Sequence, residues 1–341
     1  MGFENPLSLL TQELAIDLGT ANTVVAVRGQ GVVLDEPSVL AIRQRGKAHE
    51  VVAVGAGAKE MLGRTPDSIR AVRPLSGSVI RDYDAAEAML RYFIARSVSK
   101  RSLVKPRVLV CVPFGITQEQ RRAVQECARS AGAREVVVVH GPVAAALGAG
   151  LPAHQPLGNL ICDVGAGTTE IAVLSMGGVV TSASLTIAGD AMDQAIVAHM
   201  AKEYGIEIGE RTAEIIKIEL GCGLEHGPQR SIQVKGRQKS GIPKPVTLTS
   251  ADARHALEGP IQAIITALGQ TFERTPPELS ADILDAGLVL TGGAAQLAGL
   301  DELLGQASGL PVVLAHQPLL SVVLGAELLL DQPALLRSLI A

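Results

Sequence analysis

Ile16–Val27 reads Ile-Asp-Leu-Gly-Thr-Ala-Asn-Thr-Val-Val-Ala-Val, and the same plan returns in Cys162–Val173 as Cys-Asp-Val-Gly-Ala-Gly-Thr-Thr-Glu-Ile-Ala-Val. In both stretches an apolar run ends at an Asp, a Gly stands two residues later, and a β-rich run resumes at once. The pattern predicts a strand, a tight turn and a second strand, with backbone N–H groups and small hydroxyls presented to a phosphate. The Asp at each strand end, Asp17 or Asp163, can hold a hydrated cation. Two copies predict two similar domains that grip one nucleotide.

The composition narrows the classes of protein to which the chain can belong. Its 341 residues suffice for two or more domains with cores of their own. A formal net charge of -4 argues against nucleic acid as the main partner, and 2% aromatic residues leave no platform for stacked bases. Four scattered cysteines indicate buried thiols in a reducing cytosol. The uncharged stretch 136–162 is broken by His, Gly and Pro, so we expect no transmembrane span and no secretory leader.

Strand and helix patterns alternate along the chain, which predicts an α/β architecture with mostly parallel central sheets. Thr117 and Gln120 form a capping-box pattern at the start of one helix. The polar segment 221–244 is predicted to be a small inserted subdomain. The predicted strands are 31–42 (interrupted at Pro37), 108–112, 136–139, 160–162, 170–175, 179–185 and 288–291, and the predicted helices are 58–62, 84–98, 118–131, 189–204, 212–220 and 250–271.

Two further segments are candidates for the rest of the nucleotide. The turn Gly292-Gly293-Ala294-Ala295 follows an apolar strand and would allow close backbone approach to a purine or its α-phosphate. Glu210-Arg211-Thr212-Ala213 opens a predicted helix and could supply acceptors for ribose hydroxyls, with Lys217 stacked on the base. An ordinary capped helix with an i,i+3 ion pair explains the second segment equally well.

Together with these turns, several motifs of the chain resemble MreB, the family of bacterial actin homologues. The resemblance runs from about Leu14 to Leu330. The motifs are Val33-Leu34-Asp35-Glu36-Pro37-Ser38-Val39, Gly63-Arg64-Thr65-Pro66, Tyr92-Phe93-Ile94, Lys105-Pro106-Arg107, Val112-Pro113, Glu119-Gln120-Arg121-Arg122-Ala123-Val124 and Gly209-Glu210-Arg211-Thr212-Ala213-Glu214. The resemblance implies an actin-like fold of two lobes, which are duplicated ribonuclease H-like domains with small subdomain insertions. Lobe I would comprise residues 1–144 and 316–341, with a small subdomain at about 33–75, and lobe II residues 145–315, with one at about 186–245.

The resemblance also implies the cofactors, ATP and Mg²⁺, and the residues that would hold them. Two groups would cradle phosphates, namely Thr20, Ala21 and Asn22 in the first turn and Gly165, Ala166 and Gly167 in the second. The aspartates Asp17 and Asp163 would hold Mg²⁺ through water. Glu210, Arg211, Thr212, Ala213 and Lys217 would meet the ribose or base, and Gly292, Gly293, Ala294 and Ala295 the base.

In cellular terms, the resemblance implies a cytoplasmic protein that polymerises into filaments on the inner face of the cell membrane. Such filaments organise cell-wall synthesis and cell shape. The implied partners are further copies of the chain, the anionic membrane surface, the cell-wall synthesis machinery and an active paralogue, with no role for nucleic acid.

The chain departs from the family pattern at one position that matters for catalysis. Where the family has a pair of carboxylates before a Pro, this chain has His140-Gly141-Pro142. The family's Glu, which positions the attacking water, is replaced by Gly141, whereas Thr168, the other expected partner of that water, remains. We therefore expect ATP binding with weak or absent hydrolysis. The alternative is that His140, whose unperturbed pKa lies near neutrality, takes over as the base.

The loop Lys100-Arg101-Ser102-Leu103-Val104-Lys105 is the candidate membrane contact, because in the family this hairpin dips apolar side chains into the bilayer. Leu103 and Val104 between basic residues suit an anionic leaflet. A plain surface loop is the alternative. The apolar segments 2–10 and 334–340 are expected to anchor, pack or bind a partner.

Two other kinds of protein use the same type of fold. A small-molecule kinase would need an acceptor pocket, and no segment is dedicated to one. A chaperone-type ATPase would need a peptide-binding domain after Leu330, where eleven residues remain.

Overall fold

The computed structural model describes residues 12–45, 48–77, 79–99, 102, 104–227, 229–238 and 240–340. They form two compact units. The first comprises the chain up to Pro156, Met176–Gly178 and the chain from Leu320 onward, and the second comprises Leu157–Ser175 and Val179–Leu319. The predicted lobe bounds stay a prediction. The compact units have other bounds, because the first unit runs on to Pro156, takes in Met176–Gly178 and resumes at Leu320.

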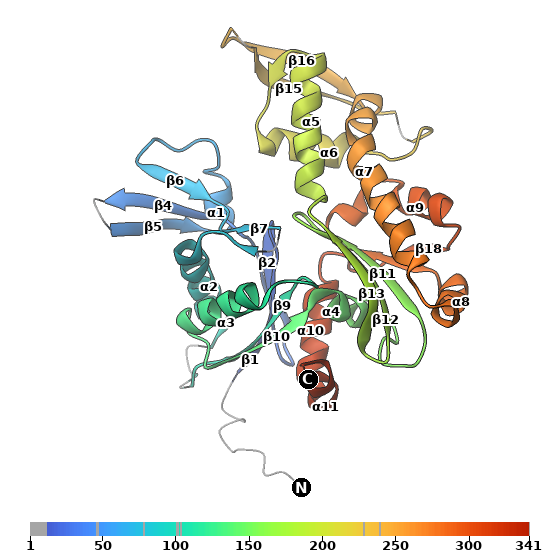
Figure 1. Cartoon of the computed structure of the whole chain (residues 1–341). Helices are drawn as coiled ribbons and strands as arrows, with labels where there is room; N and C mark the ends of the chain where they lie inside the picture. The colour runs from blue at the N-terminus through green and yellow to red at the C-terminus, as the bar shows by residue number, and fades with distance from the viewer. Residues whose placement is uncertain are drawn as a thin grey trace. The chain divides into compact units, whose positions relative to one another are not determined.

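The first unit is built on a five-stranded sheet in the order β10-β9-β1-β2-β3 (Figure 1). β1 pairs antiparallel with β2 and parallel with β9, and β9 pairs parallel with β10. The predicted strand 31–42 is in fact two strands, because β3 ends at Pro37 on the edge of the sheet, where a missing N–H is tolerated. The strands are β1 (Glu13–Leu18), β2 (Asn22–Val27), β3 (Gly31–Pro37), β9 (Arg107–Val112) and β10 (Glu135–His140).

Helices cover both faces of this sheet, and the alternation of side chains along β1 shows how. Leu14 and Ile16 pack on one face with α2 (Tyr83–Ser97) and α3 (Gln118–Ser130). Ala15 packs on the other face with α10 (Ser321–Asp331) and α11 (Pro333–Ile340). The capping box of α3 is confirmed, with the Gln120 N–H donating to Thr117 Oγ1 at 3.2 Å.

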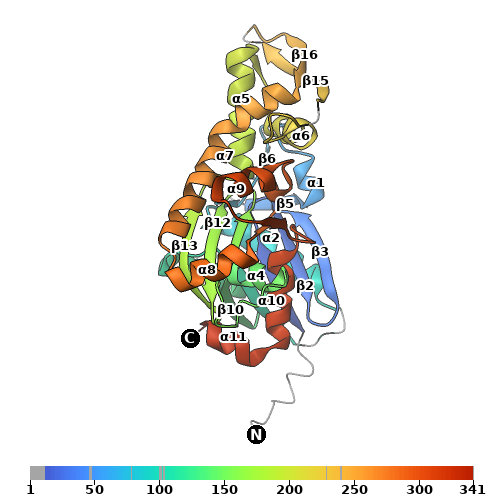
Figure 2. The ribbon, with the colours of Figure 1, turned by 90° about the vertical axis from the view of Figure 1, so that its right-hand side faces the viewer.

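On that second face, α4 (Gly141–Gly148) and α10 touch through their backbones (Figure 2). A Cβ atom on Gly148 would overlap the Ser321 carbonyl oxygen, and one on Gly325 would overlap the Ala144 carbonyl oxygen. The two glycines therefore set the distance between the helices.

We expect Gly148→Ala to lower the free energy of unfolding by about 1–3 kcal/mol, the usual cost of inserting a methyl group into a closed contact. Thermal and urea denaturation followed by circular dichroism would measure it. Gly269→Ala is the matched control, because Gly269 also lies inside a helix and nothing lies within 4 Å of an added Cβ there. The control should be neutral or slightly stabilising. Equal stability of the Gly148 variant and the control would contradict the contact.

A small three-stranded sheet extends the first unit between β3 and α2, in the order β5-β4-β6. A short helix, α1 (Ala56–Lys59), packs on it through Ala58, against Val39 and Ala41. The strands are β4 (Leu40–Arg45), β5 (Ala48–Val54) and β6 (Ile69–Val72), and they are followed by a short hairpin of β7 (Leu75–Ser76) and β8 (Val79–Ile80).

The second unit repeats the plan of the first. Its sheet has the order β13-β12-β11-β17-β18, and β11 pairs antiparallel with β12 and parallel with β17, as β1 does with β2 and β9. The strands are β11 (Asn159–Val164), β12 (Thr169–Ser175), β13 (Gly178–Leu185), β17 (Leu288–Thr291) and β18 (Val312–Leu314). The helices are α5 (Gly189–Glu203), α6 (Glu210–Leu220), α7 (Ser250–Glu273), α8 (Pro277–Ala286) and α9 (Leu300–Ser308).

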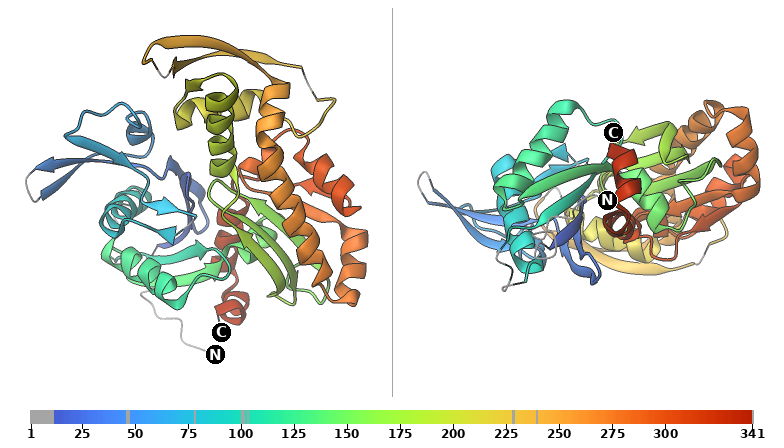
Figure 3. Two further views of the ribbon diagram at one scale, coloured as in Figure 1. Left: turned by 45° about the horizontal axis from the view of Figure 1, so that its top comes forward. Right: turned by 90° about the horizontal axis from the view of Figure 1, so that it is seen from below.

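The predicted polar insertion at 221–244 contributes β15 and the start of β16 to a second small sheet, in the order β14-β15-β16. Its long hairpin lies against α6 and α7 (Figure 3). Val234, Val246 and Leu248 point from the hairpin into the core of the second unit, which makes this insertion part of that core. The strands are β14 (Ile206–Glu207), β15 (Ser231–Gln238) and β16 (Pro243–Thr249).

Three smaller expectations concern the apolar tail, the cysteines and membrane-spanning helices. The apolar tail 334–340 packs on its own unit, since Leu336 of α11 is buried with Leu329 and Leu330 of α10. All four cysteines are buried free thiols, as predicted. Within the described residues, no helix combines the length and apolar character needed to cross a membrane. The N-terminal segment 2–10 lies outside the described residues.

Candidate nucleotide site

The first predicted phosphate turn connects β1 and β2. Leu18 lies opposite Thr23, so the four residues from Gly19 to Asn22 form the turn. Ser38 holds this turn in shape, because its Oγ donates to the Gly19 carbonyl oxygen at 2.7 Å and its N–H donates to the Ala21 carbonyl oxygen at 2.8 Å. With the Gly19 and Ala21 carbonyls held by Ser38, the turn can offer N–H groups to a ligand. The motif around Pro37 is thus the support of the turn, a role that sequence reasoning did not assign.

The side chains of this first turn are also placed by neighbours. Thr20 is buried, and the Asn22 amide donates to Asp35 Oδ1 at 2.8 Å. Thr23 shares a hydrogen bond of 2.8 Å with Ser38. A Cβ on Gly19 would collide with the Asn22 carbonyl oxygen, so only glycine closes the turn at this position.

The second predicted phosphate turn connects β11 and β12 with the same geometry. Val164 lies opposite Thr169, which leaves the four residues from Gly165 to Thr168 as the turn. The Gly165 N–H donates to the Thr168 carbonyl oxygen at 3.0 Å. The start of α5 supports this turn, because the N–H groups of Gly189 and Asp190 donate to the carbonyl oxygens of Gly165 and Ala166 at 3.1 and 2.7 Å.

The third glycine turn adjoins Asp163 within the second unit. Asp163 lies opposite Thr291, the last residue of β17. Gly292 has φ +94, and a Cβ there would approach Asp163 Oδ1 and the Val164 backbone more closely than 3.0 Å. The Gly292 N–H and the Thr291 hydroxyl both donate to the Pro318 carbonyl oxygen, at 3.0 and 3.1 Å. Ala294 and Ala295 follow in a 3₁₀ turn, η2 (Ala294–Gln296), and Ala295 is buried.

The electrostatics at Asp163 fit a bound cation. Desolvation raises the pKa of this carboxyl to about 6, although the side chain keeps partial contact with solvent. A nearby positive charge would reverse that shift by stabilising the carboxylate. Over the described residues, no three His, Cys, Asp or Glu side chains gather to hold a metal ion by themselves. Mg²⁺ beside Asp163 would therefore depend on water and phosphate oxygens for its remaining ligands.

The residues predicted to bind the ribose and base lie in the first two turns of α6. Glu210 and Arg211 are exposed, and Ala213 is buried. Lys217, one turn later, has a different environment from the one expected for base stacking. Its ammonium lies 2.8 Å from Asp193 Oδ1 of α5 and donates to the Gly189 carbonyl oxygen at 3.0 Å. Sequence reasoning missed Asp193 and Gly189, although an acid and a glycine at the start of a helix were visible.

At the predicted catalytic position, β10 ends at His140 and α4 begins at Gly141. Burial lowers the pKa of His140, the positive charge of Arg121 lowers it further, and a hydrogen bond to the Pro113 backbone opposes both. The imidazole is therefore neutral at pH 7, and its ring lies 5.1 Å from that of Phe114. Its Nδ1 is buried and has no hydrogen-bond partner among the described residues.

The first unit also contains part of the predicted membrane loop and a surface groove. In the predicted membrane loop, Lys100, Arg101 and Leu103 lie outside the described residues, whereas Val104 is half-buried and its carbonyl oxygen accepts from Ser102 Oγ at 2.9 Å.

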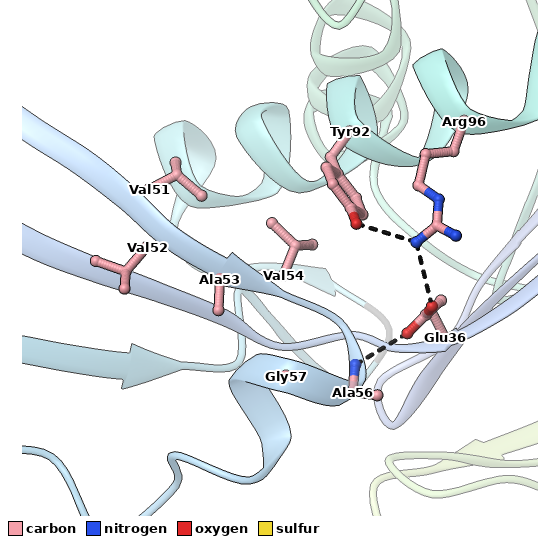
Figure 4. A pocket seen from close by; sticks show the side chains of 9 residues that line it. All are labelled: Glu36, Val51, Val52, Ala53, Val54, Ala56, Gly57, Tyr92 and Arg96. Atoms are coloured by element: carbon pink, nitrogen blue, oxygen red, sulfur yellow. Dashed lines mark hydrogen bonds and ion pairs between the residues drawn. The ribbon is translucent and has the colours of Figure 1, made fainter.

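A separate open groove of about 530 Å³ lies between β5 and α2 (Figure 4). Arg96 crosses one end of it, 3.6 Å from Glu36 and 3.0 Å from the Tyr92 hydroxyl. None of the predicted site residues lines this groove.

Comparison with known proteins gives a consistent result. The family model described as MreB/Mbl protein matches residues 11–338. The cell shape-determining protein MreB of Escherichia coli (strain K12) is 49% identical over 322 residues, which cover 93% of this chain and 92% of that protein. The cell shape-determining protein Mbl of Bacillus subtilis (strain 168) is 44% identical over 324 residues, which cover 95% and 97%.

Solved structures agree in fold. MreB5 of Spiroplasma citri bound to AMPPNP superposes with a TM-score of 0.89 at 35% identity, over 95% of this chain and 97% of that one. A structure described as the MamK double helical filament gives a TM-score of 0.79 at 20% identity, over 94% and 99%. The predicted actin-like α/β fold is confirmed.

Proposed function

Because the chain belongs to the MreB/Mbl family of actin-like proteins, we propose that it binds ATP with Mg²⁺ and assembles into filaments. The observation that carries the first part is the repeated turn, a four-residue connection of the same register after an Asp-tipped strand in each unit. The relative MreB5 of Spiroplasma citri has been solved bound to AMPPNP and to ADP, which supports a nucleotide as the ligand of these turns.

Each predicted residue has a role in this proposal. The turn residues Thr20, Ala21 and Asn22, and likewise Ala166 and Gly167, donate backbone N–H groups to phosphate oxygens. Gly165 closes the second cradle, because its N–H donates to the Thr168 carbonyl oxygen. Asp17 and Asp163 accept from water on Mg²⁺, which when bound offsets phosphate charge. The start of α6, from Glu210 to Ala213, binds the ribose, and the turn from Gly292 to Ala295 lies under the base.

We also propose that ATP hydrolysis is slow. Gly141 has no side chain to accept a proton from water, and Thr168 alone remains to orient it. Loss of a positioned base costs roughly 10²- to 10⁴-fold in rate, whereas ATP affinity depends on backbone donors that are still in place. A filament of this protein would consequently keep ATP for longer than one whose subunits hydrolyse it.

The proposed filaments lie in the cytoplasm along the inner face of the cell membrane, where they organise the cell-wall synthesis machinery and determine cell shape. Leu103 and Val104, in a loop with Lys100, Arg101 and Lys105, contact anionic lipid. A single such loop binds weakly, so many copies in a filament are needed for stable attachment. The names of the relatives, cell shape-determining proteins, support this role, and an active paralogue is a further proposed partner. A kinase or a chaperone-type ATPase gains no support from a family match over residues 11–338.

Electron microscopy of the purified protein tests this function. With Mg²⁺ and ATP on liposomes that contain anionic lipid, we expect filaments on the membrane, and on neutral liposomes we expect filaments mostly in solution. Without nucleotide we expect none. Calorimetry with the same protein gives an independent reading of ATP binding. Well-folded protein that neither takes up ATP nor polymerises would refute the proposal.

A further inference from the structure

An ion pair between α5 and α6 has no assigned role in the second unit. Lys217 Nζ lies 2.8 Å from Asp193 Oδ1, and the two side chains are only 14% and 13% exposed. The same ammonium donates to the Gly189 carbonyl oxygen at 3.0 Å. Lys217 thus contacts two residues of α5 with its charged end.

The residue that accepts from Lys217 also supports the second phosphate turn. Gly189 donates its N–H to Gly165, and the next residue, Asp190, donates to Ala166. A Cβ on Gly189 would lie 3.3 Å from the Gly165 carbonyl oxygen, 3.4 Å from Ala166 Cα and 3.4 Å from Lys217 Nζ. The phosphate turn, the start of α5 and α6 therefore meet around one glycine, where an added methyl group would be tightly packed.

Several carboxylates lie near the contact between α5 and α6, and the positive charge of Lys217 stabilises them. Desolvation raises the pKa of Asp193, and the nearby carboxylates of Glu214 and Asp190 act in the same direction, while Lys217 opposes them. Asp190 and Asp193 of α5 thus lie near Glu214 of α6, and the charge of Lys217 offsets their repulsion. Removal of one partner from a buried ion pair leaves the other charge without compensation, which is more damaging than removal of both.

We propose that the Lys217–Asp193 pair positions the second phosphate turn by fixing the start of α5 against α6, so that Lys217 acts on ATP through the turn and not by stacking on the base. The proposal rests on the proposed ATP binding. Since α6 also carries the predicted ribose residues Glu210–Ala213, the pair connects the parts of the second unit that would hold phosphate and sugar. Lys217 and Asp193 are positioning residues in this scheme.

Ligand fragments distinguish the two roles of Lys217. Displacement of a fluorescent ATP analogue would measure the affinities of three ligands, Mg·ATP, Mg·tripolyphosphate and adenosine. The proteins compared are the wild type, the single variants Lys217→Met, Lys217→Arg and Asp193→Asn, and the Lys217→Met/Asp193→Asn double variant. We expect each single neutral substitution to weaken ATP and tripolyphosphate alike, by about tenfold, and adenosine by less than about twofold. Lys217→Arg should restore part of the loss, and the double variant should bind no more weakly than the single ones. Weaker binding of adenosine with unchanged binding of tripolyphosphate would show stacking and overturn the proposal.

Two further measurements distinguish a failure of the positioning role from a failure of the proposed ATP binding. Lys202→Met is the matched control, because Lys202 lies on α5 but is 80% exposed, and its substitution should leave all three affinities unchanged. Amide hydrogen exchange of the nucleotide-free protein does not depend on ATP at all. Lys217→Met should speed exchange at Gly165 to Thr168 and at Gly189, whereas unchanged exchange there would overturn the positioning role. A wild type that shows this protection but binds no ATP would refute the proposed function alone.

Discussion

A Gly141→Glu variant is expected to release phosphate from ATP about 10²- to 10⁴-fold faster than the wild type, because it would supply the water-activating carboxylate that the resemblance to the family implies at this position. Gly141 is the first residue of α4, at the end of β10, and its φ is not positive, so the backbone accepts an L residue there. Single-turnover release of γ-phosphate with Mg·ATP would measure the gain. ATP affinity should change little, since the backbone donors of the two turns are untouched.

Two companion variants show what the gain depends on. Gly141→Gln can orient water but cannot take its proton, so it should recover only a small part of the rate. His140→Ala tests the alternative base. Because burial lowers the pKa of His140 and its ring packs against Phe114, we expect His140→Ala to leave the slow wild-type rate unchanged. A wild type that already hydrolyses ATP as fast as Gly141→Glu would contradict the proposed impairment, and loss of that rate in His140→Ala would identify His140 as the base.

Gly292→Ala is expected to weaken Mg·ATP binding by about 100-fold. The added methyl group would approach Asp163 Oδ1 and the Val164 carbonyl oxygen more closely than 3.0 Å, at a residue whose φ is +94. Both the overlap and the backbone strain cost about 1–3 kcal/mol each, and they can be relieved only by a shift of the turn away from Asp163. Calorimetric titration with Mg·ATP would measure the loss, at a temperature where denaturation curves show that the variant is folded.

The neighbouring glycine provides the control. Gly293 has φ -66, and an added Cβ would meet only the end of the flexible Leu319 side chain, at 3.2 Å. We expect Gly293→Ala to bind Mg·ATP within about threefold of the wild type. If both alanine variants bind equally well, the third turn does not contribute to the site as proposed. If Gly292→Ala alone is defective, the close approach of the turn to Asp163 is required.

The parts of the site that could be predicted are those formed by short stretches of chain. The two hairpins need only an apolar run, an Asp, a Gly and a second β-rich run, and all of these lie within twelve residues in each copy. The capping box at Thr117 and Gln120 is local in the same way. Periodicity found the strands of both central sheets except β18, but it missed α8, α9, α10 and α11, where leucines and alanines are frequent enough to obscure the helical stripe.

The sequence could not reveal interactions between side chains that lie far apart along the chain. Nothing in the spacing of Asp193 and Lys217 marks them as partners, because they meet only when α5 and α6 pack against each other. Ser38 supports the first turn from the far end of β3, and Gly148 touches Ser321 only in the folded unit. Local pattern was thus enough to identify the duplicated hairpins and the α/β class, since each is a property of neighbouring residues. Only the tertiary structure decided which residues support those hairpins, because burial and electrostatic pairing depend on which distant surfaces the fold brings within a few ångströms.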